Sequence, residues 1–466
     1  MAPSTVNQLS DADAIFLSME GPNSGAHVGA ILLLDPSTCD DFSFEKLRRH
    51  LAARTELIPR FSWKLQDVPL GIDRPYWVEA EGFHPRDNII CTAVPSPGNI
   101  EQVYALASRL HAQPLDRSRP LWQVWFIEGV EGGGAAIYMK THHCLIDGTG
   151  SAGLMEVMAD LLPDATAPMF APDGFAEERP SPPTTADIML NAYRNSTQRP
   201  AKMARHLRRG LADLWKNRGN EHAVGEIEHT CFNKAISKRR AFASASFDLE
   251  RVRDLTKHFD VKVNDVVLEI AGSVVNRWLR VRGEAPKRSL VALCPISTRG
   301  DEKGLGNQVS SMSVSLCTDI ADPAERLRGI HKNSRHAKQG VENGSFDWTA
   351  VMGESFMPAF TQMIFRAAEL GVDSAPLPAN FVVSNVRSTP IPLYIAGARL
   401  ESMLPMSLLA VGNGLNITLV SYCNRINVGI IVDPELIPDP WELAELFPMA
   451  LEELETAAEG VVHQAR

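Results

Sequence analysis

Two adjacent histidines, a carboxylate and a glycine form a compact group in the segment Thr141-His142-His143-Cys144-Leu145-Ile146-Asp147-Gly148. Histidine has an ordinary pKa of ~6.5, so it can accept a proton near neutral pH. An alcohol becomes an effective nucleophile when such an imidazole removes its proton during attack, and a well-placed base contributes roughly 10²–10⁴-fold to the rate. The segment therefore indicates general-base chemistry on a hydroxyl group.

The same residues allow two other interpretations. The histidines could be a purely structural pair, or they could bind a metal ion. A metal site needs a third ligand at suitable spacing, and Cys144 is adjacent to His143, so the two side chains do not readily converge on one ion. Asp147 would either pair with an arginine or orient an imidazole, while Gly148 permits a tight backbone turn.

The elements that must position this segment are strands and helices in alternation. A strand at 135–140 leads into the histidines, and a second strand at 121–127 precedes it across the glycine-rich turn 131–134. A helix is expected after Gly148, where apolar residues recur at helical spacing. Further elements of this half are predicted as a strand at 27–34 and helices at 44–53 and 101–111.

The second half of the chain is also predicted to contain both strands and helices. We expect strands at 242–247 and 290–296, helices at 250–259 and 265–279, and a hairpin of 415–422 with 426–433. A last helix is expected to start at Asp439-Pro440, with Asp as its N-cap and Pro in the first helical position. The division predicted is an N-terminal domain at 1–165, a proline-rich polar crossover at 166–240 and a C-terminal domain at 241–466.

The crossover contains a basic stretch at 202–218 that is predicted to be helical. Its apolar residues lie at helical spacing, namely Met203, Leu207, Leu211, Leu214 and Trp215. The first interpretation is a surface helix that packs this apolar face on the protein. The second is a contact between its basic residues and anionic lipid head groups or ligand phosphates.

Composition narrows the class of protein. The net charge of −10 disfavours a nucleic-acid binder, which would carry a basic excess. Seven scattered cysteines without a CxxC pair indicate neither a disulfide framework nor a zinc site, and they suit a reducing cytoplasm. No secretory signal and no apolar run of the ~20 residues needed to cross a bilayer is visible. We therefore expect a cytoplasmic protein, soluble or peripheral to the inner face of the membrane or to lipid inclusions.

The histidine segment resembles the HHxxxDG motif of the chloramphenicol acetyltransferase-like acyltransferases. Other segments resemble, in register over nearly the whole chain, the bacterial wax ester synthase/acyl-CoA:diacylglycerol acyltransferase family. These segments are Leu9–Leu17 with His27-Val28-Gly29, Pro114–Trp122 (PLDRSRPLW), Asn264-Asp265-Val266-Val267 (the ND motif), Leu305–Val309 (LGNQV), Ser384-Asn385-Val386 and Leu393–Leu400. One departure stands out, because Arg387-Ser388-Thr389 replaces the Pro-Gly-Pro usual in the family.

The resemblance implies roles for individual residues. His143 would be the general base, His142 would support the loop, and Asp147 would be structural, with Arg299 as its expected partner. Asn264 is expected as a helix N-cap, and the family also ties the ND motif, with Asp265, to the active site. The segment with Asn307 and Gln308 is expected to hold the domains together more than to touch a ligand.

The fold implied is α/β, with two chloramphenicol acetyltransferase-like domains, mixed sheets flanked by helices and an active-site tunnel at their interface. The function implied is transfer of a long-chain acyl group from acyl-CoA, a co-substrate, to diacylglycerol or a fatty alcohol, with no cofactor and no metal. Two alternatives remain: a condensation-type synthase using carrier-bound donors, and a non-catalytic lipid-inclusion protein.

Overall fold

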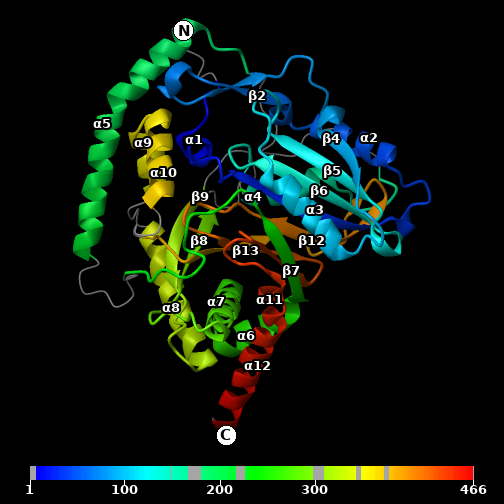
Figure 1. Ribbon diagram of the computed structural model, residues 1–466, viewed down its shortest axis with the longest axis vertical. Helices are drawn as coiled ribbons and strands as arrows, with labels where there is room; N and C mark the ends of the chain where they lie inside the picture. The colour runs from blue at the N-terminus through cyan, green and yellow to red at the C-terminus, as the bar shows by residue number, and fades with distance from the viewer. Residues whose placement is uncertain are drawn as a thin grey trace.

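Two six-stranded mixed sheets, with helices on their outer faces, form the body of the molecule (Figure 1). The computed structural model describes residues 7–146, 148–165, 180–216, 226–297, 309–342, 348–371 and 377–464. The predicted mixed α/β fold with two sheet-based domains is confirmed.

The first sheet carries the histidine segment. Its strand order is β11 (Tyr394–Ile395), β12 (Ala398–Met406), β1 (His27–Asp35), β6 (Ala135–His142), β5 (Trp122–Glu128) and β4 (Ile89–Ala93). The pairs are antiparallel except β4 with β5. Two of its strands, β11 and β12, come from near the end of the chain, so the sheet joins segments far apart in sequence.

The second sheet is built from the C-terminal half. Its order is β7 (Ala241–Asp248), β14 (Arg425–Val432), β13 (Leu415–Tyr422), β10 (Phe381–Arg387), β8 (Val291–Ser297) and β9 (Val309–Ser315). β10 runs parallel to β8 and β13, and the remaining pairs are antiparallel. A separate two-stranded sheet pairs β2 (Trp63–Gln66) with β3 (Tyr76–Glu79).

The helices divide into three groups. Around the first sheet lie α2 (Phe44–Thr55), α3 (Ile100–Ala112) and α4 (Gly148–Met158). The second sheet is covered by α6 (Leu249–Phe259), α7 (Val263–Val281), α8 (Pro323–Glu342), α11 (Trp441–Ala444) and α12 (Leu446–Gln464). Along one flank in Figure 1 stand α1 (Asp11–Met19), α5 (Thr185–Lys216), α9 (Trp348–Ser355) and α10 (Pro358–Gly371).

An apolar core between the two sheets fixes them against each other. It combines Ile31 and Tyr138 of the first sheet with Phe242 and Ile431 of the second. Gly429 on β14 lies so close to β12 that a Cβ there would come within 1.8 Å of the carbonyl oxygen of Pro405. Only glycine permits this approach, so β14 packs directly on a strand of the other sheet.

Strand β6 is anchored to α3 by a buried lysine. Side chains alternate along a strand, so Tyr138, Lys140 and His142 share one face. The Lys140 ammonium group donates to the carbonyl of Leu110 at 2.9 Å and to that of Gln113, at the C-terminal end of α3. A cation is favourable at that end of a helix dipole. Burial nevertheless lowers the pKa of Lys140 to about 7.

Most elements expected from the sequence are present, with shifts of one to three residues at their ends. Three expectations were wrong in detail. The last helical segment begins at Trp441 with Pro440 as its N-cap, rather than with Asp439 as N-cap and Pro440 as its first residue. Asn264 is not an N-cap: α7 starts at Val263 with Lys262 as its N-cap. The basic stretch at 202–218 is the second half of the much longer helix α5, and Leu207 and Leu211 face outward rather than packing on the protein. The side chains of Leu214 and Trp215 lie outside the described residues.

A buried ion pair joins α7 to α8, and its loss should destabilise the second domain. Arg326 donates to Glu269 Oε1 at 2.7 and 2.9 Å, and both side chains are buried. Arg326→Met is expected to cost about 3–5 kcal/mol of unfolding free energy at pH 8, because it leaves a buried carboxylate without its cation.

The loss of unfolding free energy caused by Arg326→Met should be smaller at pH 5 than at pH 8. Burial raises the pKa of Glu269 to about 7 from its ordinary 4.5. A raised pKa in the folded state favours folding at low pH, and this contribution is lost as pH rises through the folded value. Urea unfolding at both pH values tests this, with Arg253→Met, which breaks an exposed pair with Glu250, as a control expected to cost less than about 1 kcal/mol. Equal deficits at pH 5 and pH 8 would contradict this assignment.

Candidate functional site

Strand β6 ends at His142, and the pairing of β6 with β1 sets the position of both histidines. His142 lies opposite His27 in the antiparallel register. One residue further on, the backbone N–H of His143 donates to the carbonyl of Ala26 at 2.8 Å. The chain then turns, and α4 begins at Gly148. His143 is therefore held at the rim of the first sheet, where the strand gives way to a loop.

The ring of His143 stacks on the ring of Phe16 from α1. The ring centroids are 3.8 Å apart and the planes differ by 9°. α1 starts at an N-cap formed by Ser10, whose side chain accepts from the backbone N–H of Asp13. Stacking on one face fixes the plane of the imidazole, and the half-buried ring is suited to exchange a proton with a bound hydroxyl group.

His142 supports this loop through both of its ring nitrogens. Its Nδ1 accepts a hydrogen bond from the backbone N–H of Cys144 at 3.0 Å. The ring proton must then reside on Nε2, which lies 3.2 Å from Glu20 Oε1. Burial opposes ionisation of Glu20, but the contact with His142, together with Arg117 and the backbone at Ala26, lowers the pKa of the carboxyl. Glu20 and His142 together form a clamp on the backbone that follows His143.

Glu20, His27 and His142 also approach one another at distances that suit a metal ion. Glu20 Oε1 lies 3.5 Å from His27 Nε2, close to the separation of two ligands on tetrahedral zinc, roughly 3.4 Å for bonds near 2.1 Å. A metal-bound imidazole donates from its other nitrogen, yet His142 accepts there. His27 Nε2 already accepts from the backbone N–H of Leu115 at 3.3 Å. The contacts of these residues therefore fit an electrostatic clamp better than a metal site.

Cys144 is next to the proposed base but is a poor nucleophile. Its side chain is fully buried, and burial raises the pKa of the thiol well above its usual range. A thiol attacks as the thiolate. The geometry therefore gives no support to an acyl-cysteine intermediate.

The ND motif contributes a buried anchor in the second domain. Asn264 is a partly buried residue in the first turn of α7. Asp265 is buried; it accepts from the backbone N–H of Lys262 at 3.0 Å and contacts His331 Nδ1 at 2.7 Å and the hydroxyl of Ser334. These partners tie α7 to α8, within the second domain.

Several expected site residues cannot be placed. Asp147, Arg299, Asn307 and Gln308 lie outside the described residues. The segment that departs from the usual Pro-Gly-Pro is described: Arg387 is exposed at the end of β10, and Ser388 donates its backbone N–H to the carbonyl of Ser421 at 3.1 Å.

Sequence reasoning assigned no role at this site to two residues: Phe16 was named only as part of the segment Leu9–Leu17, and Glu20 was not named. Phe16 and Glu20 belong to the segment before β1, more than 120 residues before the histidines. Neither has a residue type or spacing that signals chemistry on its own. The pairing of β1 with β6 and the packing of α1 on α9 and α10 together bring them to His142 and His143.

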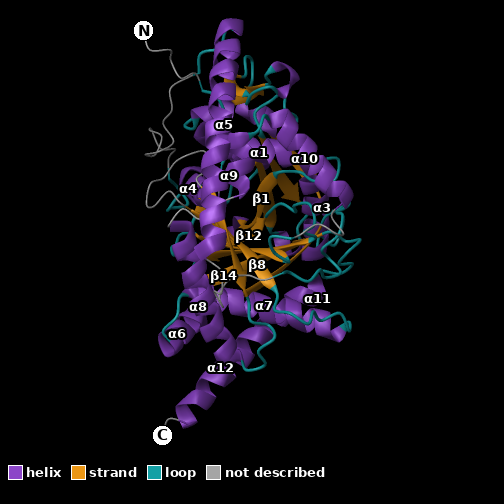
Figure 2. Cartoon of the chain, turned by 90° about the vertical axis from the view of Figure 1, so that its left-hand side faces the viewer, coloured by secondary structure: helices purple, strands orange, loops and turns teal. Residues whose placement is uncertain are grey.

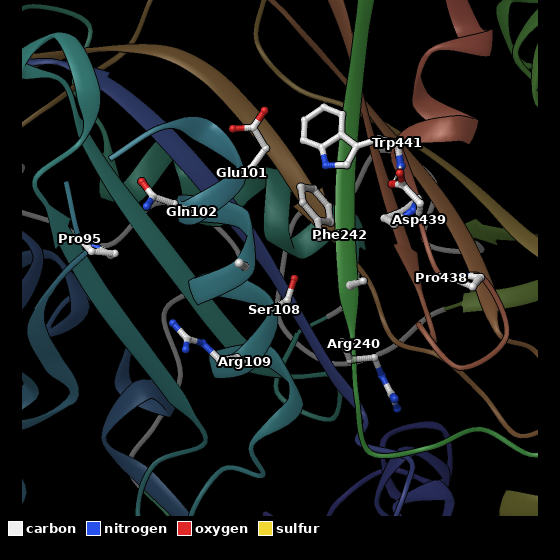
Figure 3. Close-up of a pocket in the computed structure, with 13 residues that line it drawn as sticks. Pro95, Glu101, Gln102, Ser108, Arg109, Arg240, Phe242, Pro438, Asp439 and Trp441 are labelled. Carbon is white, nitrogen blue, oxygen red and sulfur yellow. Dashed lines mark hydrogen bonds between the residues drawn. The ribbon is translucent and has the colours of Figure 1, made fainter. Parts of the chain in front are cut away.

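A cavity of about 460 Å³ lies elsewhere at the junction of the two sheets. Figure 3 shows residues from α3, the start of β7 and the loop before α11 around it. Arg109 and Arg240 lie toward one end, and Glu101 and Trp441 toward the other. Neither histidine of the motif lines this cavity, so it is separate from the loop that carries His143.

Comparison with solved structures defines the class. The first condensation domain of the calcium-dependent antibiotic synthetase matches with a TM-score of 0.60 at 16% identity, over 98% of this chain and 97% of its own. At that identity the match concerns the fold alone. The wax ester synthase/diacylglycerol acyltransferase of Marinobacter aquaeolei VT8 matches with a TM-score of 0.69 and 26% identity, over 97% of this chain and 100% of its own.

Sequence comparison defines the family. The model of the wax ester synthase/diacylglycerol acyltransferase catalytic domain matches residues 9–267, and that of the WS/DGAT C-terminal domain matches 305–455. A Mycobacterium tuberculosis protein whose name places it among the diacylglycerol O-acyltransferases is 30% identical over 98% of this chain and 93% of its own. The O-acyltransferase WSD of Acinetobacter baylyi is 29% identical over 92% of this chain and 93% of its own. The chain belongs to the wax ester synthase/diacylglycerol acyltransferase family, and it is an acyltransferase.

The clamp on His142 makes Glu20 a testable positioning residue. Glu20→Ala should lower kcat roughly 10- to 100-fold with little change in KM, because a displaced base loses its alignment with bound substrate. Glu20→Gln retains an acceptor for His142 Nε2–H and should recover part of the loss. Steady-state kinetics on both variants measures this, with the exposed Glu81 changed to Ala as a matched control.

A ¹⁵N NMR spectrum of the histidine rings separates positioning from general damage. In the wild type, His142 should carry its proton on Nε2, and Glu20→Ala should weaken that tautomer while the protein remains folded. A Glu20→Ala variant with full kcat, or a wild-type His142 protonated on Nδ1, would refute the clamp.

Proposed function

We propose that this protein moves a long-chain acyl group from acyl-CoA to the hydroxyl of diacylglycerol or of a long-chain fatty alcohol. The products are free CoA and a triacylglycerol or a wax ester. The observation that carries the proposal is the position of His143, fixed on Phe16 at the end of β6 in a chain of this family. Relatives named for diacylglycerol acyltransfer and for wax ester synthesis support both acceptors.

His143 acts as the general base in this mechanism. It takes the hydroxyl proton as the oxygen attacks the thioester carbonyl carbon, and the carbonyl electron pair moves onto oxygen. The tetrahedral intermediate collapses, the carbon–sulfur bond breaks, and the CoA sulfur receives the proton from His143. The atoms balance without a covalent enzyme intermediate, which agrees with the buried, weakly acidic thiol of Cys144.

The remaining motif residues take supporting roles in the proposal. Asp147 pairs with Arg299 to hold the loop, and the segment with Asn307 and Gln308 holds the two domains together. Asn264, in the ND motif, belongs to the active site. A tunnel at the domain interface admits acyl-CoA from one side and the acceptor from the other. Domain junctions are frequent positions for such ligand channels.

The proposal also places the reaction at a lipid surface inside the cell. Diacylglycerol and long-chain alcohols reside in membranes and lipid inclusions, so the enzyme would act while peripherally attached. None of the helices in the part of the chain described here is long and apolar enough to cross a bilayer. Attachment would then depend on a surface of the folded protein.

The first experiment is CoA release from palmitoyl-CoA with hexadecanol or dioleoylglycerol as acceptor, with the lipid product identified by chromatography. His143→Ala should lower acceptor-dependent turnover by roughly 10²–10⁴-fold, because it removes the base. Full turnover by the variant would refute the mechanism while keeping the reaction.

Cys144→Ala is the matched control, since it changes the adjacent residue in the same loop. We expect most of the activity to remain, apart from a packing effect. Activity lost in Cys144→Ala and retained in His143→Ala would instead indicate acyl transfer through the thiol. Absence of wild-type turnover with both acceptors would favour carrier-bound donors, as used by the condensation domains that share the fold.

A further inference from the structure

The face of helix α5 that packs on the protein is partly polar, although Ala192 is buried there and Ile188 and Met203 are partly buried. Several polar and charged side chains of this face contact the body of the molecule. Asn195 and Arg199 both reach Asp73, at 2.7 and 3.0 Å, and Lys202 reaches Asp11 at 2.9 Å. His206, also buried, lies 3.4 Å from Glu354 of α9. Polar contacts thus make up much of the attachment of α5 to the body of the molecule.

The outward face of α5 carries a stripe of large apolar residues. Five large apolar side chains along this helix are 58–71% exposed, namely Met189, Leu190, Tyr193, Leu207 and Leu211. We call these five residues the outer stripe. With 3.6 residues per turn, all five project to the same side. A surface helix normally turns its apolar face to the core, and an exposed apolar patch of this kind marks an interaction site.

The charges beside the outer stripe indicate what covers it. α5 contains seven Lys or Arg residues and two Asp residues, a net charge of +5 in a chain of net charge −10. Arg194, Arg205, Arg208 and Arg209 are all exposed. An apolar stripe edged by arginines is the pattern of a helix lying in the interface of an anionic membrane.

Helix α10 carries further exposed apolar residues. Met363 and Leu370 are 56% and 92% exposed, and Leu70, in the turn packed against α10, is 90% exposed. Figure 1 shows α5, α9 and α10 together along one flank of the molecule, and Figure 2 views the molecule from that side.

This flank is connected directly to the catalytic loop. α1 packs between α9 and α10 and its Phe16 stacks on His143. Ser24, four residues after Glu20, donates to Glu369 of α10 at 3.1 Å. The segment that positions His142 and His143 is thus attached to the apolar flank rather than to the opposite side.

We propose that the outer stripe of α5 and the exposed residues of α10 dock on an anionic phospholipid bilayer, and that the acceptor enters from that side. Docking brings the helices α5, α9 and α10 to the lipid, and α1 packs on this group, so that diacylglycerol reaches His143 from the side of the bilayer while the water-soluble acyl-CoA approaches from elsewhere. The entry route rests on the proposed function; the docking itself does not.

Vesicle flotation tests the docking. Wild-type protein should bind vesicles of phosphatidylcholine with 30% phosphatidylglycerol, and bind pure phosphatidylcholine more weakly, since surface charge contributes. Leu207→Ser with Leu211→Ser should weaken binding by at least about tenfold, because affinity follows the apolar area inserted. Arg205→Gln with Arg208→Gln and Arg209→Gln should remove the preference for the anionic lipid.

A matched control removes exposed apolar side chains elsewhere. Val281 and Met449, on α7 and α12, are 81% and 48% exposed, and changing both to Ser should leave vesicle binding unchanged. If the Leu207 and Leu211 variant binds as the wild type does, the docking surface is wrong. Light scattering gives the oligomeric state of the wild type and of the Leu207 and Leu211 variant. If the wild type is a dimer that these changes dissociate, and vesicle binding is unchanged, the outer stripe serves self-association and the proposal is overturned.

Measurements of turnover test the entry route of the acceptor separately from vesicle binding. The Leu207 and Leu211 variant should lose about tenfold or more of its turnover with dioleoylglycerol embedded in vesicles and keep its turnover with hexanol in solution. Equal loss with both acceptors would refute bilayer entry. A wild-type protein that binds vesicles but turns over no acceptor would refute the proposed function and leave the docking surface standing.

Discussion

The antiparallel register between β1 and β6 is the constraint on which the rest of the site depends. It sets His27 opposite His142 and brings the carbonyl of Ala26 to the backbone N–H of His143. A slip by one residue would turn every side chain of β6 to the opposite face of the sheet. Lys140 would then leave the end of α3, and His142 would lose Glu20. The register is thus the common cause of the clamp, the stacked ring and the anchored strand.

The two halves of the chain are interlocked rather than joined end to end. β12 comes from the C-terminal half and pairs with β1 in the first sheet, and β14 packs on it where Gly429 meets Pro405. Between them lies an apolar core that uses side chains of both sheets. The position of the first sheet relative to the second is therefore set by strand pairing as well as by packing.

Local patterns predicted much of this fold. Alternation and turn residues located β6, β7 and the β13–β14 hairpin, and the doubled histidine located the loop. The contribution of Phe16 and Glu20 could not be predicted, because it arises from pairing between distant strands and neither residue is unusual where it stands. The cap of α7 was misassigned because Asn264 and Asp265 are both plausible N-terminal residues, and the helix uses Asp265 at its third position. The orientation of α5 was also missed, since helical spacing identifies an apolar stripe but not whether it faces protein or solvent.

Phe16 gives the N-terminal segment a practical importance that its position does not suggest. Its ring stacks on His143, and the helix that carries it packs against α9 and α10. A change that shifts α1 therefore moves the support of the proposed base even when the histidine loop itself is left untouched. A fluorescent label is better carried by α12, because this helix projects away from the body of the molecule (Figure 2). Labelled forms of the enzyme are therefore best built through α12.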